Sequence, residues 1–146
     1  MAILRMDNVL IVVDDLEAMI AFFVELGMEL EGRMPIEGRW VDRVIGLDGA
    51  RQEIAMLRTP DGHGGIELAK FHAPTAVRLE PQEAAVNTLG IRRVMFAVDD
   101  LEEVLARLRT HGAELVGEVT RYEDAYLLCY LRGPEGIVVA LAQPLS

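Results

Sequence analysis

The sequence predicts an α+β protein of two tandem β-α-β-β-β modules, and an internal repeat is the first observation behind this prediction. Residues 8–32 (NVLIVVDDLEAMIAFFVELGMELEG) align without a gap on residues 93–117 (RVMFAVDDLEEVLARLRTHGAELVG), and 11 of the 25 pairs are identical. A repeat of this length indicates that both copies form the same supersecondary unit. The second observation is the apolar pattern inside the unit, and the third is a turn that recurs later in each half.

Each copy of the repeat predicts a strand, a capped helix and a glycine stop. The strands are short apolar runs, Val9–Val13 and Val94–Val98. An Asp three residues before a Glu then gives the spacing of a capping box. Apolar residues at i, i+3, i+4 and i+7 predict a helix of about three turns, closed by a glycine. In the first copy the capping-box pair is Asp14 and Glu17, the apolar residues are Leu16, Met19, Ile20 and Phe23, and the glycine is Gly27. In the second copy the pair is Asp99 and Glu102, the apolar residues are Leu101, Val104, Leu105 and Leu108, and the glycine is Gly112.

Three more strands complete the first module. Pro35 and Gly38 predict irregular structure before them. The Asp48-Gly49 pair is a hairpin signal, and residues 59–62 (TPDG) read as a turn. The predicted strands are Trp40–Leu47, Gln52–Arg58 and Gly65–Phe71.

The second module repeats this plan, and its turn at residues 133–136 (GPEG) echoes the turn of the first module. We expect a single domain over residues 1–146, with modules at 5–71 and 91–143 and a linker at 72–90 that packs on the surface or on a partner. The elements predicted after residue 71 are a short helical turn at Gln82–Val86, a strand at Arg93–Val98, a helix at Leu101–His111, and strands at Leu115–Tyr122, Ala125–Arg132 and Ile137–Ala142.

Charge and cysteine content limit the partners. The net charge of −10 argues against nucleic acid and against an anionic membrane surface. The single cysteine, Cys129, excludes an intrachain disulfide and suits a reducing compartment. No segment reaches the roughly 20 apolar residues of a membrane span, and the first residues lack a secretory pattern. We therefore expect a cytoplasmic protein.

A strand ending in V-D-D-L, an amphipathic helix and a later Pro-(Asp/Glu)-Gly turn, all present twice, resemble the vicinal oxygen chelate superfamily. That superfamily includes glyoxalase I, bleomycin-resistance proteins, fosfomycin-resistance enzymes, methylmalonyl-CoA epimerase and extradiol dioxygenases. The resemblance covers the chain apart from the linker. It implies curled mixed sheets around a cup that closes within one chain or across a homodimer, and we expect the homodimer. Because this fold hosts several chemistries and non-enzymatic binders, it does not define the function.

The resemblance also implies where a metal would bind. Metal-dependent members place one ligand, usually His, near the start of each module's first strand, and another, usually Glu, on each last strand. The corresponding residues here are Asn8 and Arg93, and Glu67 and Ala140. Arg has no lone pair to offer and Ala has no donor atom, so we expect no metal or other cofactor, with a divalent metal as the alternative.

The two-residue period of a strand predicts which side chains line the cup. If Asn8 and Arg93 face inward, so do Leu10, Val12, Met95 and Ala97. Cys129 and Leu131 belong to the more apolar face of their strand and should pack under the helix. The predicted ligand-binding residues are Asn8, Glu67, Arg93, Trp40, Met56, Met95, Tyr126 and Tyr130.

Several of these residues keep two interpretations. Glu67 and Arg93 form a structural ion pair, or Arg93 binds a ligand carboxylate or carbonyl while Glu67 is a weak candidate for a catalytic base. Trp40 stacks on a ligand or belongs to the core. His63, His72 and His111 are expected in a turn, in the linker and at a helix end, with no site role; a metal site with His63 and Glu67 has little support. Cys129 is expected to be buried and not a nucleophile.

The leading hypothesis is a metal-independent protein of the glyoxalase/bleomycin-resistance type that holds an apolar or aromatic compound, for example to sequester a toxic natural product. The first alternative is an enzyme of the same superfamily (a lyase, isomerase or dioxygenase-like protein) that uses a non-standard metal site or Glu67 as base. The second alternative is a module that serves dimerisation alone.

Overall fold

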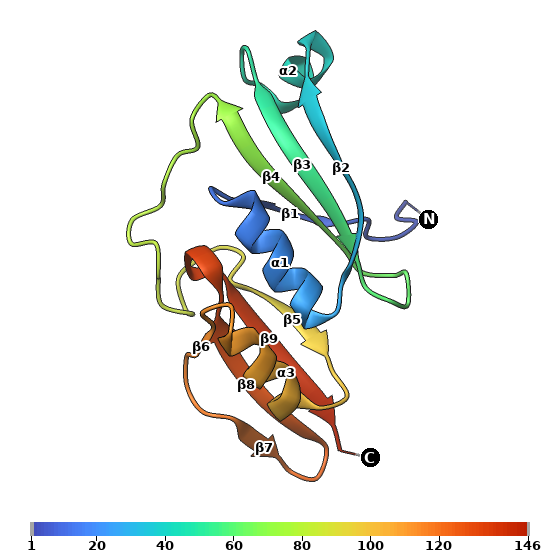
Figure 1. Cartoon of the computed structure of the whole chain (residues 1–146), viewed down its shortest axis with the longest axis vertical. Helices are drawn as coiled ribbons and strands as arrows, with labels where there is room; N and C mark the ends of the chain where they lie inside the picture. Colours follow the sequence, from blue (N-terminus) through green and yellow to red (C-terminus); the bar gives the residue numbers. More distant parts are fainter. Residues whose placement is uncertain (1, 146) are drawn as a thin grey trace. The chain divides into compact units, whose positions relative to one another are not determined.

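The computed structural model describes residues 2–145 and confirms the predicted α+β fold. The described residues form three α-helices and nine strands, and the strands make two mixed sheets that remain open. The chain divides into two compact units, Met1–Arg78 and Leu79–Ser146, and each unit holds one sheet with its helix or helices (Figure 1).

The first sheet has the strand order β1-β4-β3-β2, in which β1 runs parallel to β4 and the other neighbours are antiparallel. The helix α1 (Leu16–Leu26) lies between β1 and β2 in sequence and covers one face of this sheet (Figure 1). The strands of the first sheet are β1 (Val9–Val12), β2 (Glu29–Glu37), β3 (Arg51–Arg58) and β4 (Gly65–Ala73).

An aspartate caps α1 as predicted in kind, but the predicted residue is wrong by one position, because the N-cap is Asp15 and not Asp14. The Asp15 carboxylate accepts a hydrogen bond from the Ala18 backbone N–H at 3.0 Å. Gly27 ends the helix at φ 126°, a backbone conformation that side chains with a Cβ rarely adopt. The predicted apolar stripe is buried, together with Phe22, whose ring meets Phe23 edge to face at 5.2 Å between centroids. This stripe anchors α1 on the sheet.

The prediction of a strand at Trp40–Leu47 is wrong, because the segment forms the helix α2 (Arg39–Ile45). Its Trp, Val and Ile residues have the composition of a strand, but tertiary contacts decide the outcome. Val41 is buried, and the Asp42 carboxylate accepts hydrogen bonds from the N–H groups of Gly49 and Ala50, both at 2.9 Å. The predicted Asp48-Gly49 hairpin is therefore the loop between α2 and β3.

The prediction that Pro35 interrupts regular structure is also wrong. The strand β2 continues through Pro35, which is paired with Glu53 of β3. A proline is tolerated here because β2 is the last strand of its sheet and its outer side needs no ladder hydrogen bond.

The second sheet has the order β5-β9-β8-β6, with β7 also paired to β8. Its helix α3 (Leu101–Arg109) is capped by Asp100 and not by the predicted Asp99. The Asp100 carboxylate accepts from the Glu103 N–H at 3.1 Å, and the helix ends two residues before the predicted His111. The predicted strand Leu115–Tyr122 is interrupted at residues 116–119. The strands of this sheet are β5 (Arg93–Ala97), β6 (Glu114–Leu115), β7 (Thr120–Tyr122), β8 (Tyr126–Arg132) and β9 (Val138–Pro144).

The segment that joins the units contains turns but no helix, so the predicted helical turn at Gln82–Val86 is wrong. Part of this segment is fixed to the turn η1 (Pro134–Gly136) of its own unit. Arg132 donates to the backbone oxygens of Ala84, at 2.5 Å, and Gly136, at 3.0 Å. Gln82 Nε2 donates to the backbone oxygen of Glu135 at 3.2 Å. These bonds explain how a long irregular segment is held on a folded surface.

Candidate functional site

Each sheet has one face covered by its helix and a second face, called here the open face. In β1 and just before it, Asn8, Leu10 and Val12 are exposed on the open face, while Val13 is buried on the helix side. The same alternation holds in β5, where Arg93, Met95 and Ala97 are exposed and the residues between them are half-buried. The predicted orientation of both first strands is confirmed.

Glu67 lies in the middle of the open face of the first sheet. Its neighbours across the ladders are Leu10 of β1 and Met56 of β3, so a half-buried carboxylate stands between two apolar side chains. Within the described part of residues 1–78, this carboxylate makes no ion pair. Arg93 belongs to the other unit, so the ion pair between Glu67 and Arg93 stays a prediction.

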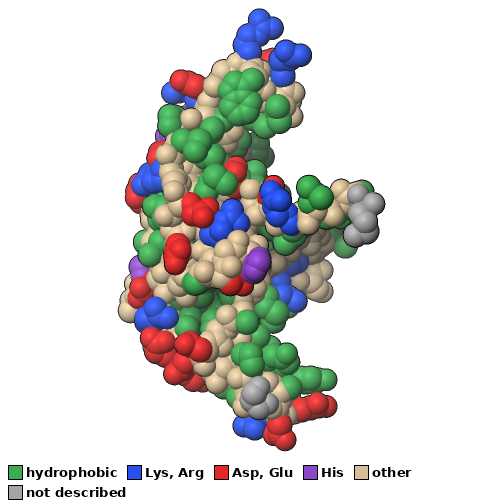
Figure 2. Space-filling view, turned by 90° about the vertical axis from the view of Figure 1, so that its right-hand side faces the viewer, with side chains coloured by type: hydrophobic (Ala, Val, Ile, Leu, Met, Phe, Trp, Pro, Cys, Tyr) green, Lys and Arg blue, Asp and Glu red, His purple; other side chains and the backbone are tan. Residues whose placement is uncertain are grey.

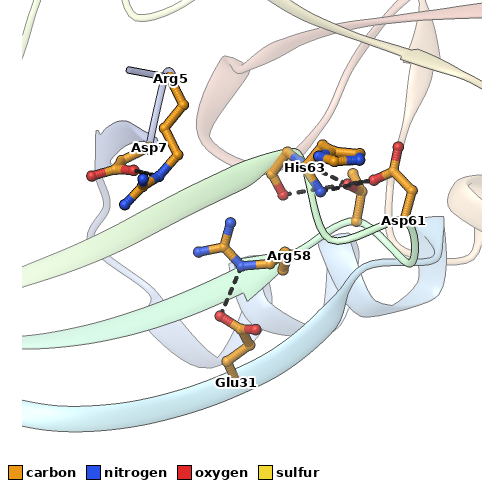
Figure 3. A network of polar contacts seen from close by, with 8 residues as sticks. Arg5, Asp7, Glu31, Arg58, Asp61 and His63 are labelled. Carbon is orange, nitrogen blue, oxygen red and sulfur yellow. Dashed lines mark hydrogen bonds and ion pairs between the residues drawn. The ribbon is translucent and has the colours of Figure 1, made fainter. Parts of the chain in front are cut away.

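The end of this sheet near Asn8 is polar and closely packed. Arg58 Nε and a carboxylate oxygen of Glu31 are 3.0 Å apart, and Arg5 pairs with Asp7 at 2.7 Å (Figure 3). A Cβ atom built on Gly65 would lie 2.5 Å from the backbone oxygen of Asp7 and 3.4 Å from Asn8 Cβ. The chain at Asp7 and Asn8 therefore passes directly over Gly65, which explains the glycine at this position.

The open face of the second sheet carries the two predicted tyrosines. Tyr126 and Tyr130 alternate with Cys129 and Leu131, which are buried under α3. The ladder places Tyr130 beside Ala140 of β9, and Ala140 beside Met95 of β5. Exposed fractions of 42% for Tyr126 and 43% for Met95 show that the apolar groups of this face reach the surface.

Arg93 lies over the ring of Tyr130. The guanidinium carbon is 5.5 Å from the ring centroid, within the range of a cation–π contact. Between the strands of these two residues runs β9, which places Val138 beside Arg93 and Ala140 beside Tyr130. Both residues of β9 are buried. The Arg93 side chain therefore crosses β9 diagonally to reach the ring of Tyr130.

Within its own unit, as far as the structure describes it, the Arg93 guanidinium has no carboxylate partner. The ion pairs of this unit join Arg107 to Glu103, at 2.9 Å, and Arg121 to Asp124, at 3.0 Å. Within the described part of residues 79–146, Arg93 has no such pair, and Arg132 on the same face is engaged by backbone oxygens. A contact with a ring face does not satisfy the five N–H donors of a guanidinium.

A groove that sequence reasoning missed lies at the outer edge of β8. It has a volume of about 290 Å³ and exists because β6 ends at Leu115 and β7 starts only at Thr120. The sequence pattern predicted a continuous strand here, and the glycine at position 117 was the one signal against it. The lining residues are Val116, Gly117, Glu118, Thr120, Leu128, Cys129 and Tyr130.

Trp40 occupies a different environment from the one predicted for a strand residue. It lies on α2 and is 61% exposed, so it is not part of the core. With Val44 it belongs to an exposed apolar surface at the end of the first unit that carries α2, where Figure 2 shows hydrophobic side chains next to Lys or Arg. A role for Trp40 in ligand stacking stays a prediction.

The histidines and the cysteine are placed mostly as expected. His63 lies in the turn after β3, where its backbone N–H donates to Asp61 at 3.0 Å (Figure 3). His72 lies in β4 rather than in the linker, and His111 follows α3. Cys129 is 3% exposed, and its burial raises the pKa of the thiol, which disfavours the nucleophilic thiolate.

The residues at the four metal-ligand positions do not fit a divalent cation. Arg93 and Ala140 offer no donor atom, which leaves the amide of Asn8 and the carboxylate of Glu67. Across residues 2–145, no group of three or more His, Cys, Asp or Glu side chains is arranged to hold a metal ion. In the same part of the chain, no helix has the length and apolar character needed to cross a membrane.

Comparisons with known proteins agree with this architecture. The model of the Glyoxalase/Bleomycin resistance protein/Dioxygenase superfamily matches residues 5–141. A glyoxalase family protein from Bacillus cereus is 53% identical, with a TM-score of 0.95 over 100% of this chain and 99% of that one. A fosfomycin resistance protein, FosX, from Listeria monocytogenes, in a complex with Mn(II) and 1S,2S-dihydroxypropylphosphonic acid, shares the fold at 14% identity, with a TM-score of 0.62 over 97% and 93% of the two chains. No curated protein matches the sequence.

Proposed function

The chain belongs to the Glyoxalase/Bleomycin resistance protein/Dioxygenase superfamily, and on this premise we propose that it binds a small apolar or aromatic molecule without the help of a metal. The proposal places the ligand on the open face of the second sheet. It includes a cytoplasmic homodimer, as the resemblance implies, and sequestration of a toxic compound as the biological role.

The observation that carries this proposal is the position of Arg93 over Tyr130, beside Ala140. Within the described part of residues 79–146, the Arg93 guanidinium makes no ion pair, and it stands on a face made of tyrosine, methionine and small side chains. Sites for small molecules combine an apolar, aromatic lining with a few polar groups that orient the ligand. A guanidinium in place of a metal ligand provides positive charge at that position without a cation from solution.

An enzyme of the same superfamily is the second candidate, and the position of Glu67 favours it. The carboxylate lies between Leu10 and Met56 on an open face, where a substrate proton could come within reach. In this case, Glu67→Gln should abolish turnover while ligand binding is retained. If the wild type shows no turnover and Glu67→Gln loses ligand binding, the protein is better described as a binding protein than as an enzyme.

The first test is metal content. Protein purified without a histidine tag is exposed to Zn, Ni, Mn and Fe(II), passed through gel filtration and analysed by elemental mass spectrometry. We expect far less than one metal per chain. About one metal per chain, retained through the column, would refute the metal-independent function.

The second test is ligand binding in the presence of EDTA. Aromatic compounds are screened by thermal shift against the wild type and Arg93→Ala, and hits are repeated with EDTA. We expect hits that survive the chelator and weaken in the variant. Hits that disappear with EDTA would point to the metal-dependent alternative, and gel filtration of the same samples reports the oligomeric state.

A further inference from the structure

The groove beside β8 and the Arg93 site share one residue, Tyr130. Its ring lies under the guanidinium, and the same residue is among those that line the groove. A ligand that packs on Tyr130 would therefore have a cation at one end and an apolar groove at the other. Both features belong to one compact unit, so their relation is part of the same sheet.

The groove is suited to a flat apolar group. Val116, Leu128 and Tyr130 form apolar walls, and Gly117 leaves room because a Cβ built there would have no atom within 4 Å. The Val116 N–H donates to the Tyr130 backbone oxygen at 2.9 Å, which fixes the start of the 116–119 segment against β8. An aromatic ring gains an additional contribution from offset or edge contact with a tyrosine.

The charges of this region determine the orientation of a bound ligand. Arg93 supplies positive charge at one end, and Glu118 is an exposed acid at the groove. An anionic group is therefore favoured near Arg93 and disfavoured at the far end of the groove. The net charge of −10 on the chain disfavours polyanions in general.

We infer that the ligand is an aromatic monocarboxylate, whose carboxylate is bound by Arg93 and whose ring occupies the groove beside Tyr130. This inference deepens the proposed function and rests on it. The planar guanidinium matches a carboxylate with two parallel hydrogen bonds, a geometry that a lysine does not reproduce. The Thr120 hydroxyl, which donates to the Glu118 backbone oxygen at 3.3 Å, retains acceptor capacity for a polar substituent on the ring.

The test compares three probes of similar size by isothermal titration calorimetry in EDTA: 2-naphthoate, its neutral counterpart 2-naphthalenemethanol, and the dianion 2,6-naphthalenedicarboxylate. We expect 2-naphthoate to bind at least about tenfold more tightly than either of the others. The neutral probe lacks the hydrogen bond between charged groups, which contributes that much or more. The second carboxylate of the dianion would lie in the groove with Glu118. Arg93→Met should remove this preference and leave the binding of the neutral probe nearly unchanged.

A second variant tests the groove. Gly117→Leu fills the groove and should weaken the binding of both 2-naphthoate and 2-naphthalenemethanol at least about tenfold, a loss of apolar contact over most of one ring. Gly32→Leu is the matched control, since Gly32 is the repeat equivalent of Gly117, also has open space around its Cβ position and lies in the first unit. It should bind 2-naphthoate as the wild type does.

The outcomes separate this inference from the proposed function. Equal binding of the neutral and anionic probes, or equal effects of Gly117→Leu and Gly32→Leu, would overturn the assignment of the ligand and the groove while the binding function stands. Preferred binding of the dianion would also overturn it. Failure of every aromatic compound, both in this set and in the wider thermal-shift screen, would refute the proposed function itself.

Discussion

Gly65→Ala tests the close approach of the chain at Asp7 to the first sheet. The new Cβ would lie 2.5 Å from the backbone oxygen of Asp7. Carbon and oxygen atoms normally approach to about 3.3 Å, so the strand and the segment before β1 must separate by nearly 1 Å. Gly65 has no positive φ, so the alanine itself introduces no backbone strain.

The magnitude follows from two opposing terms. Overpacking a tight contact costs about 1–3 kcal/mol, and replacing glycine by alanine returns about 0.4–1 kcal/mol by reducing the freedom of the unfolded chain. Asp7 and Asn8 are exposed, so the segment has space to move and the cost stays moderate. We expect the free energy of unfolding to fall by about 1–2 kcal/mol and Tm by about 2–8 °C.

Differential scanning calorimetry and urea unfolding measure this change. Gly32→Ala is the control, because its Cβ would meet no atom within 4 Å and its φ is not positive. It should be as stable as the wild type or slightly more stable. A Gly65→Ala protein with the stability of Gly32→Ala would refute the close contact between Gly65 and Asp7.

Three further predictions concern the helix caps, the buried thiol and one turn. Asp15→Ala and Asp100→Ala should each lower the free energy of unfolding by about 1 kcal/mol in urea, because each removes the acceptor of a helix N–H; unchanged stability would contradict the capping. Cys129 should resist 5,5′-dithiobis(2-nitrobenzoate) at pH 8 in the native protein and react fully in denaturant, since it is buried and its pKa is raised; rapid native reaction would be contrary evidence. The Thr59 hydroxyl, followed by the His63 N–H, lowers the pKa of Asp61 below 3.8. Asp61 therefore contributes stability above that pH and loses it as the pH falls through its lower folded-state pKa. The Tm difference between the wild type and Asp61→Ala should be largest near neutral pH and disappear in acid, and a difference that grows in acid would contradict this sign.

The repeat carries most of the information about the fold. Identical residues at fixed spacing predicted the two modules, and the alternation along β1 and β5 predicted the orientation of Asn8, Arg93 and Met95. These predictions succeed because burial against a helix leaves one choice of face for each strand. The same alternation in β8 predicted that Tyr126 and Tyr130 lie on the sheet face opposite to Cys129 and Leu131.

The failures have a common physical cause, which is tertiary context. The helix α2 has the composition of a strand and forms because Val41 is buried and Asp42 binds the loop after it. Pro35 is tolerated only because β2 lies at the edge of its sheet. Neither the strand order nor these hydrogen bonds can be obtained from local periodicity.

The sequence predicted the strand faces on which the candidate residues lie, but not their contacts. Strand alternation indicated that Arg93 and Tyr130 share a face, yet their cation–π contact depends on the strand order β5-β9-β8. The groove beside β8 depends on the interruption between β6 and β7. The sequence of residues 115–122 has the pattern of one continuous strand and does not predict this interruption.

The most direct test of the account is an amide ¹H–¹⁵N NMR titration of the protein with 2-naphthoate in EDTA. We predict saturable shifts concentrated at Arg93, Tyr130 and residues 116–120, and their loss in Arg93→Met at the same probe concentration. Shifts confined to other surfaces, or shifts at these residues that appear only after a divalent metal is added without chelator, would contradict the claim that Arg93 and Tyr130 form a metal-independent binding site.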